Sequence, residues 1–157
     1  METLQHTAHQ VSALNDLIRI NNDRITGYKK IINAKLDDDL EDLFTQFIYQ
    51  GQQNINDLTQ YIKRLGGEPA DGSRLSGKYY HAWMDMRATF NRLNRQAILD
   101  YSEYGEDVAK SSYRKALEDK ELTWHDKYVQ KILFQEFEEL KRSHRIVEKL
   151  RDATTIS

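Results

Sequence analysis

Hydrophobic positions along this chain repeat at steps of three and four residues, which is the spacing of one helix face. These stripes predict four long helices, over residues 10–36, 39–65, 95–119 and 123–151, and one short helix over residues 78–90. The first stripe begins at Val11, Leu14 and Ile18 and continues through Asn21 and Ile25. Because these positions gather on one side of the helix, that side is expected to be buried.

Turn-forming and capping residues separate the predicted helices. Three consecutive acids, residues 37–39, stand where the first helix stops and the second starts. Acidic residues suit a helix N-terminus, because its free N–H groups favour negative charge. Gly66 and Gly67, with Pro69 beyond them, end the second helix. Asn94 and Thr123 are expected to cap the two later long helices, and residues 153–157 are expected to fray.

The lengths of the connections predict the fold. The first two long helices are joined by a very short link, and so are the last two, so each pair is expected to be antiparallel. A long crossover, which contains the short helix, joins the two pairs. Such a crossover is typical of ferritin-like bundles. We therefore predict an all-α, ferritin-like antiparallel four-helix bundle, a single domain over residues 1–157 with a core of about residues 10–152.

Composition and charge exclude several classes of partner and site. Of the 157 residues, 39% are hydrophobic and none is cysteine, which excludes disulfides and thiolate metal sites. No apolar run is long enough to span a membrane, and a net charge of −2 gives no general attraction to nucleic acid. The start of the chain has no basic and apolar leader. We therefore expect a cytoplasmic protein with no membrane or nucleic-acid partner.

Several phrases of the sequence, taken together and in order, have a family resemblance. They are ALNDLI at 13–18, NNDR at 21–24 followed by GY at 27–28, LGGEP at 65–69, GS at 72–73, AWMD at 82–85, AIL at 97–99, GED at 105–107 and YR at 113–114. The chain resembles, over about residues 10–152, a bacterial family of ferritin-like four-helix proteins with no assigned function. The resemblance implies the ferritin-like bundle and no established activity.

Many ferritin-like bundles hold two metal ions, and the sequence can be tested for that centre. The site needs a carboxylate from each of two helices and a Glu-x-x-His motif from each of the other two. None of the five histidines has a glutamate three residues before it; they are His6, His9, His81, His125 and His144. We therefore expect no metal cofactor and a protein that is not an enzyme.

The carboxylates agree with that expectation. Helical periodicity places Asp23 away from the buried stripe and Glu106 on its flank, and it leaves Glu136 as the one inward-facing carboxylate at mid-height. The alternative is a divergent iron- or manganese-binding oxidase or iron-handling protein. Its metal ligands would be Glu106, Glu136, Glu139 and His144.

A polar layer is predicted at the middle of the bundle instead. Matching heights across the helix pairs places Asn21, Asn54 and Glu136 at one level, with the hydroxyls of Tyr28 and Tyr101 nearby. Such a layer is interpreted as a hydrogen-bond network that fixes helix register. The alternatives are the relic of a metal site and a pocket for a small ligand.

An interaction surface is predicted on the crossover. Tyr80, Trp83 and Met84 belong to residue types enriched at protein interfaces, and the alternative is that they only cover the end of the bundle. The sequence thus favours a non-enzymatic bundle that acts by protein interaction or assembly, as a homo-oligomer or with an unknown protein partner. A stress-related role is an analogy with ferritin-like relatives.

Overall fold

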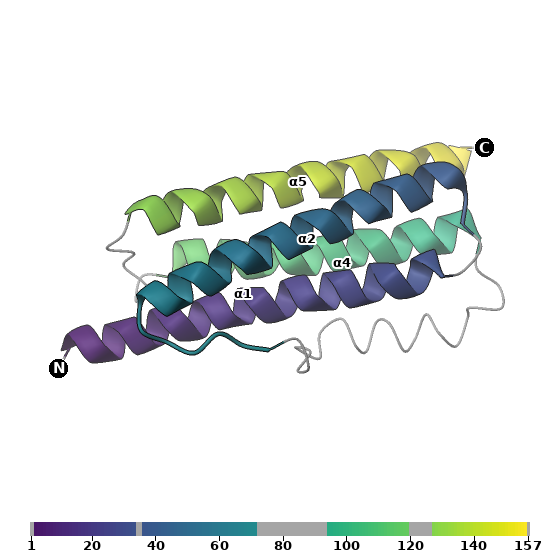
Figure 1. Ribbon diagram of the computed structural model, residues 1–157. Helices are drawn as coiled ribbons and strands as arrows, with labels where there is room; N and C mark the ends of the chain where they lie inside the picture. The colour runs from purple at the N-terminus through teal and green to yellow at the C-terminus, as the bar shows by residue number, and fades with distance from the viewer. Residues whose placement is uncertain (1, 34–35, 72–93, 120–126, 157) are drawn as a thin grey trace.

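The computed structural model describes residues 2–33, 36–71, 94–119 and 127–156, and these residues form helices without any strand (Figure 1). The helices are α1 (Glu2–Ile32), α2 (Asp38–Arg64), α4 (Arg95–Glu118) and α5 (Lys127–Ile156). For these residues, the prediction of an all-α fold with four long helices is confirmed. None of these helices combines the length and apolarity needed to cross a membrane. Some predictions fall outside the described residues. These are the short helix over residues 78–90, the surface residues Tyr80, Trp83 and Met84, and the cap Thr123.

Three predicted helix boundaries were wrong. Helix α1 begins at Glu2 rather than at residue 10 and ends at Ile32 rather than at residue 36. Near its start it contacts the residue that follows α4. There the ring of His9 contacts Asp119, with 3.4 Å between Nε2 and Oδ2. Helix α5 continues to Ile156, so the tail expected to fray is helical. Thr154 in that tail accepts a hydrogen bond from the guanidinium of Arg95.

The predicted start and stop signals act as expected in α2 and α4. The side chain of Asn94 accepts a hydrogen bond from the backbone N–H of Ala97 at 2.8 Å, which caps α4. Gly66 ends α2 with φ of 79°, a left-handed conformation that favours glycine. The backbone N–H of Gly67 then donates to the carbonyl of Ile62. Asp38 and Asp39 lie in the first turn of α2, beside its free N–H groups.

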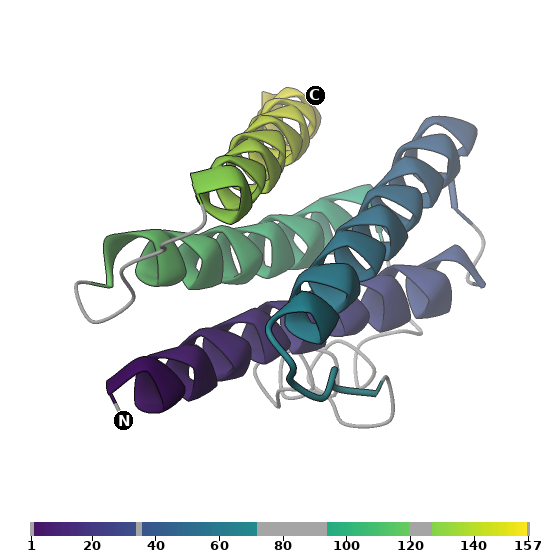
Figure 2. The ribbon, with the colours of Figure 1, turned by 60° about the vertical axis from the view of Figure 1, so that its left-hand side comes forward.

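The helices pack as two neighbouring pairs (Figures 1 and 2). Helix α1 lies against α2 and α4 lies against α5, and the pairs meet mainly where α1 contacts α4. The contact between α2 and α5 is the smallest of the four. At one end of the molecule, Arg95 of α4 forms ion pairs with Asp37 and Asp39 beside the start of α2. This end of α4 is thereby tied both to α2 and to the tail of α5.

The hydrophobic core is divided into two clusters. The first lies around Leu14 and Leu58 and the second around Phe44 and Phe47. Buried polar residues fall between the two clusters along α1, α2 and α4. These residues are Asn21, Asp23 and Arg24 on α1, Asn54 on α2, and Ser102 and Glu106 on α4. The interior of the bundle is therefore polar at mid-height and apolar on either side.

Candidate functional site

A chain of buried hydrogen bonds joins all four helices at mid-height. Asn54 of α2 donates from Nδ2 to Oδ1 of Asn21 on α1, at 3.2 Å. Asn21 donates from Nδ2 to the hydroxyl of Tyr113 on α4 at 2.9 Å and to the carbonyl of Leu17 at 2.8 Å. The Tyr113 hydroxyl donates to Oε1 of Glu136 on α5, at 2.7 Å. Buried polar groups of this kind fix how the helices align, because a slip would leave them without partners.

Glu136 is the acidic end of this chain. It is 4% exposed, and burial raises the pKa of its carboxyl to about 8. The hydrogen bond from Tyr113 lowers this pKa, whereas the nearby charges of Asp57 and Glu139 raise it. Glu136 therefore carries its proton at neutral pH. Its Oε2 is buried without a hydrogen-bond partner in the described part of the chain.

A buried ion pair lies next to the hydrogen-bond chain. The guanidinium of Arg24 on α1 donates from Nε and Nη2 to the two carboxylate oxygens of Glu106 on α4, at 2.8 and 2.7 Å. Both side chains are almost completely excluded from solvent, at 1% and 0% exposure. The ring of Phe47 stands 5.9 Å from the guanidinium carbon. The two charges neutralise each other in a bidentate geometry, the form in which a buried pair is best tolerated.

Tyrosines extend the polar contacts toward the second cluster. The hydroxyls of Tyr28 on α1 and Ser102 on α4 are 2.8 Å apart. Burial raises the pKa of Tyr28 and of Tyr101 above the ordinary value, so both hydroxyls are neutral. Tyr101 lies against Gly27 of α1, and its buried hydroxyl has no hydrogen-bond partner among the described residues. Asn21 thus contacts Tyr113, and Tyr28, which comes later on α1, contacts Ser102, which comes earlier on α4. The contacts therefore run in opposite directions along the two helices.

The structure places the residues predicted for this layer as follows. Asn21, Asn54 and Glu136, which were expected at one level, belong to one hydrogen-bond chain. The hydroxyl between Asn21 and Glu136 comes from Tyr113. Tyr28 lies after Asn21 on α1 and Tyr101 lies before Tyr113 on α4, so neither supplies it. Tyr113 was missed because the hydrophobic stripe of α4 indicates which side of the helix is buried but not which side chain contacts α5.

Two predictions about carboxylates were wrong. Glu106 is fully buried rather than on the flank of α4, and Asp23 is 1% exposed rather than turned away from the core. The reason is that α1 contacts both α2 and α4, so its buried arc is wider than the stripe of one partner. Arg24, also missed, is buried by the same contact.

The mid-height residues do not fit a di-metal centre. Both oxygens of Glu106 are bound by a guanidinium, and Oε1 of Glu136 accepts from a tyrosine. The four ligands considered from the sequence, Glu106, Glu136, Glu139 and His144, are not brought together as a set. In the described residues, His144 instead forms a group with Glu103 and Glu148, whose ligand atoms lie within 4.8 Å of one another.

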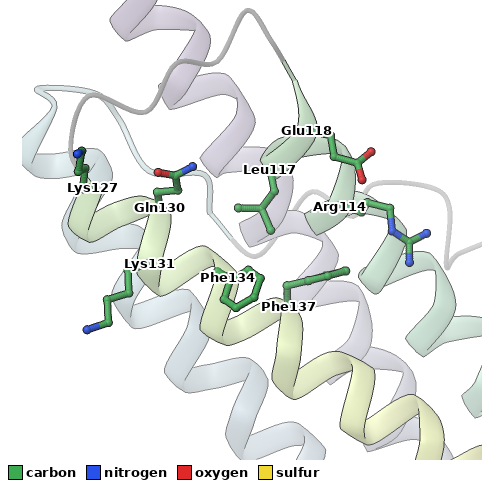
Figure 3. Close-up of a pocket in the computed structure, with 8 residues that line it drawn as sticks. All are labelled: Arg114, Leu117, Glu118, Lys127, Gln130, Lys131, Phe134 and Phe137. Atoms are coloured by element: carbon green, nitrogen blue, oxygen red, sulfur yellow. The ribbon is translucent and has the colours of Figure 1, made fainter.

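A pocket opens on the surface where α4 ends and α5 begins (Figure 3). It has a volume of about 500 Å³, and its apolar lining residues are Leu117, Phe134 and Phe137. Phe134 is 53% exposed, which is unusual for a phenylalanine. The other residues that line it are polar or charged: Arg114, Glu118, Lys127, Gln130 and Lys131. Sequence reasoning missed this pocket, although Phe134 stands off the buried stripe of α5.

Comparison with known proteins gives one match. Residues 9–119 match the model of a family described as a domain of unknown function, DUF2383. No curated protein matches the chain. No solved structure matches it either. The matched region includes Asn21, Arg24, Asn54, Glu106 and Tyr113 and ends before α5, which carries Glu136. The chain belongs to this family of unknown function, DUF2383.

Proposed function

We propose that this protein is a non-enzymatic, ferritin-like antiparallel four-helix bundle that acts by assembly with further copies of itself. The reverse order of partners between α1 and α4 supports the antiparallel arrangement. A bacterial, cytoplasmic protein with a stress-related role is part of the same proposal, by analogy with ferritin-like relatives.

The mid-height layer supports a structural rather than a catalytic core. Ferritin-like oxidases use inward carboxylates to hold cations. Here the guanidinium of Arg24 already neutralises Glu106, and Glu136 is protonated at neutral pH. A cation would have to displace the guanidinium from Glu106 and the proton from Glu136, and this cost disfavours iron or manganese at this height.

The observation that carries the proposal is the exposed Phe134 in the pocket between α4 and α5 (Figure 3). An aromatic anchor with a charged rim is typical of a protein-binding surface. Three cations and one acid line the pocket, so it carries +2, whereas the whole chain carries −2. The rest of the molecule therefore carries −4, which makes the surface of a second copy electrostatically complementary to the pocket.

The charge of the pocket also indicates how copies meet. Two pockets facing each other would bring Arg114, Lys127 and Lys131 of both copies together, and like charges repel. The pocket should therefore bind a different, acidic surface of the next copy. Such a contact joins unlike surfaces, and it builds a ring or an open chain rather than a simple two-fold dimer.

Sedimentation velocity over a wide range of protein concentration tests this proposal. The wild-type protein is expected to form species larger than a dimer, and added salt should weaken them because it screens the charges. Phe134→Ser and Lys131→Glu should each abolish the larger species. Tyr49→Ser is the matched control, because Tyr49 is 63% exposed on α2 and does not line the pocket.

A wild-type protein that stays monomeric at every concentration would overturn the assembly proposal. So would larger species that persist in Phe134→Ser and vanish in Tyr49→Ser, because the contact would then lie on α2.

A further inference from the structure

A cluster of metal-ligating side chains lies between α4 and α5, apart from both the polar layer and the pocket. Glu103 belongs to α4, and His144 and Glu148 lie one turn apart on α5. One ligand atom from each residue lies within 4.8 Å of the other two. A spacing of four residues places His144 and Glu148 on the same helix face, toward Glu103.

The distances within the cluster suit an ion better than they suit direct hydrogen bonds. Nε2 of His144 is 3.8 Å from Oε1 of Glu103, and Nδ1 is 3.7 Å from Oε2 of Glu148. Hydrogen bonds between such groups are shorter, at about 2.7–3.2 Å. Two ligands that each sit about 2.1 Å from one ion are separated by roughly 3–4 Å. The two glutamates face opposite nitrogens of the ring, and a single ion can bind only one of these nitrogens. One carboxylate must therefore turn toward the nitrogen that the other already faces. Because one ligand atom from each residue lies within 4.8 Å of the other two, this turn is a small one.

Charge and exposure favour a cation at this position. Two carboxylates flank His144, and their negative charge exceeds the single positive charge of Arg151, which pairs with Oε2 of Glu103. The other oxygen of Glu103, Oε1, faces the histidine. The His144 and Glu103 side chains are 14% and 21% exposed, whereas that of Glu148 is 45% exposed. The cluster is therefore sheltered on the helix side and open to ions from the solvent.

We propose that Glu103, His144 and Glu148 form a binding site for a divalent transition-metal ion of the zinc class, which links α4 to α5. One imidazole nitrogen with two carboxylate oxygens is a donor set that Zn²⁺ accepts, with water in the fourth position. Glu106, Glu136 and Glu139 take no part in it. The site does not depend on the assembly proposed above.

Isothermal titration of the full chain, without a histidine tag, with zinc chloride tests the site. One zinc ion per chain is expected, and Glu148→Gln should raise Kd by more than about tenfold, since even weaker outer contacts have effects of that order. His144→Ala should abolish binding. Arg151→Met should lower Kd, because it releases the second oxygen of Glu103.

Two control variants make the result specific. His9→Ala should bind zinc as wild type does, because Asp119 is the one carboxylate that His9 contacts among the described residues. Glu136→Gln should also bind normally, because Glu136 lies in the polar layer. Since Glu148 is half-exposed, its substitution leaves the fold intact and keeps the test valid if His144→Ala is unstable. Zinc binding that survives Glu148→Gln unchanged, or that is lost in His9→Ala, would overturn the proposal.

Discussion

The carboxyl group of Glu136 keeps its proton at neutral pH because it is buried, with a pKa of about 8. In the unfolded chain the ordinary value of 4.5 applies. Below pH 4.5 both states hold the proton, so the group adds no pH dependence to the free energy of unfolding. Between pH 4.5 and 8 only the folded state holds it, so this free energy falls as the pH rises.

Glu136→Gln should remove this dependence, because a carboxamide stays neutral and its oxygen can still accept from Tyr113. Relative to the variant, the wild-type protein is expected to lose about 1.4 kcal/mol of stability for each pH unit inside that window. Urea unfolding of both proteins from pH 5 to 9 measures the difference. If the free energy of unfolding changes with pH in the same way for the two proteins, Glu136 is ionised in the folded state.

Only part of the polar layer could be predicted at the residue scale. Asn21, Asn54 and Glu136 could be found because each interrupts an apolar stripe. Arg24 and Glu106 could not, because each reads as an ordinary charged residue on a soluble helix. Their burial depends on a partner 82 residues away in the chain, and only the packing of α1 on α4 brings the two together.

At the scale of the helices, the Arg24–Glu106 pair determines how α1 meets α4. Arg24→Met should destabilise the protein by about 3–5 kcal/mol, because it leaves the buried carboxylate of Glu106 without its countercharge. The double variant Arg24→Met/Glu106→Leu should recover most of this loss, since it removes both charges. Urea unfolding of the single and double variants tests the coupling. A loss below about 1 kcal/mol for the single variant would show that the pair is solvated.

The close approach of α1 to α4 at Gly27 gives a second prediction. A Cβ atom at this position would lie 2.7 Å from the Tyr101 hydroxyl and 3.6 Å from the ring carbon that bears it. In a helix interior, replacing glycine by alanine normally raises the free energy of unfolding by up to about 1 kcal/mol. In the wild-type background the contact with Tyr101 should cancel this gain for Gly27→Ala. In the Tyr101→Phe background that gain should return.

Thermal unfolding of the four proteins in this cycle measures the coupling. Tyr101→Phe alone should be tolerated, because the buried hydroxyl has no hydrogen-bond partner among the described residues. Equal effects of Gly27→Ala in both backgrounds would show that the two helices are farther apart than the structure has them.

Helix boundaries could be predicted where local chemistry determines them. Asn94 caps α4 with its own side chain, and Gly66 ends α2 with its own backbone conformation. The start of α1 could not be predicted, because residues 2–9 carry no clear apolar stripe. One of these residues, His9, contacts Asp119 just beyond the end of α4, which is 110 positions away in the chain.

For the whole molecule, the four helices and their order follow from hydrophobic periodicity and the connections between them. The division of the core into two clusters does not follow from the sequence pattern. It requires Asn21, Asn54 and Glu106 to meet at one height, and that height depends on the register of helices that are distant in sequence. The pocket around Phe134 likewise needs the end of α4 beside the start of α5 (Figure 3).

The central claim is that the middle of this bundle is a structural polar layer and not a di-metal centre. The most direct test is the metal content of the untagged protein after anaerobic loading with Fe(II) and desalting. For the wild type, we predict no more than about one ion per chain, since the described residues hold one cluster of three possible ligands. For His144→Ala, which removes one of these ligands, we predict essentially none. About two ions per chain in both proteins, lost only in Glu136→Ala, would contradict the account and restore a di-metal oxidase.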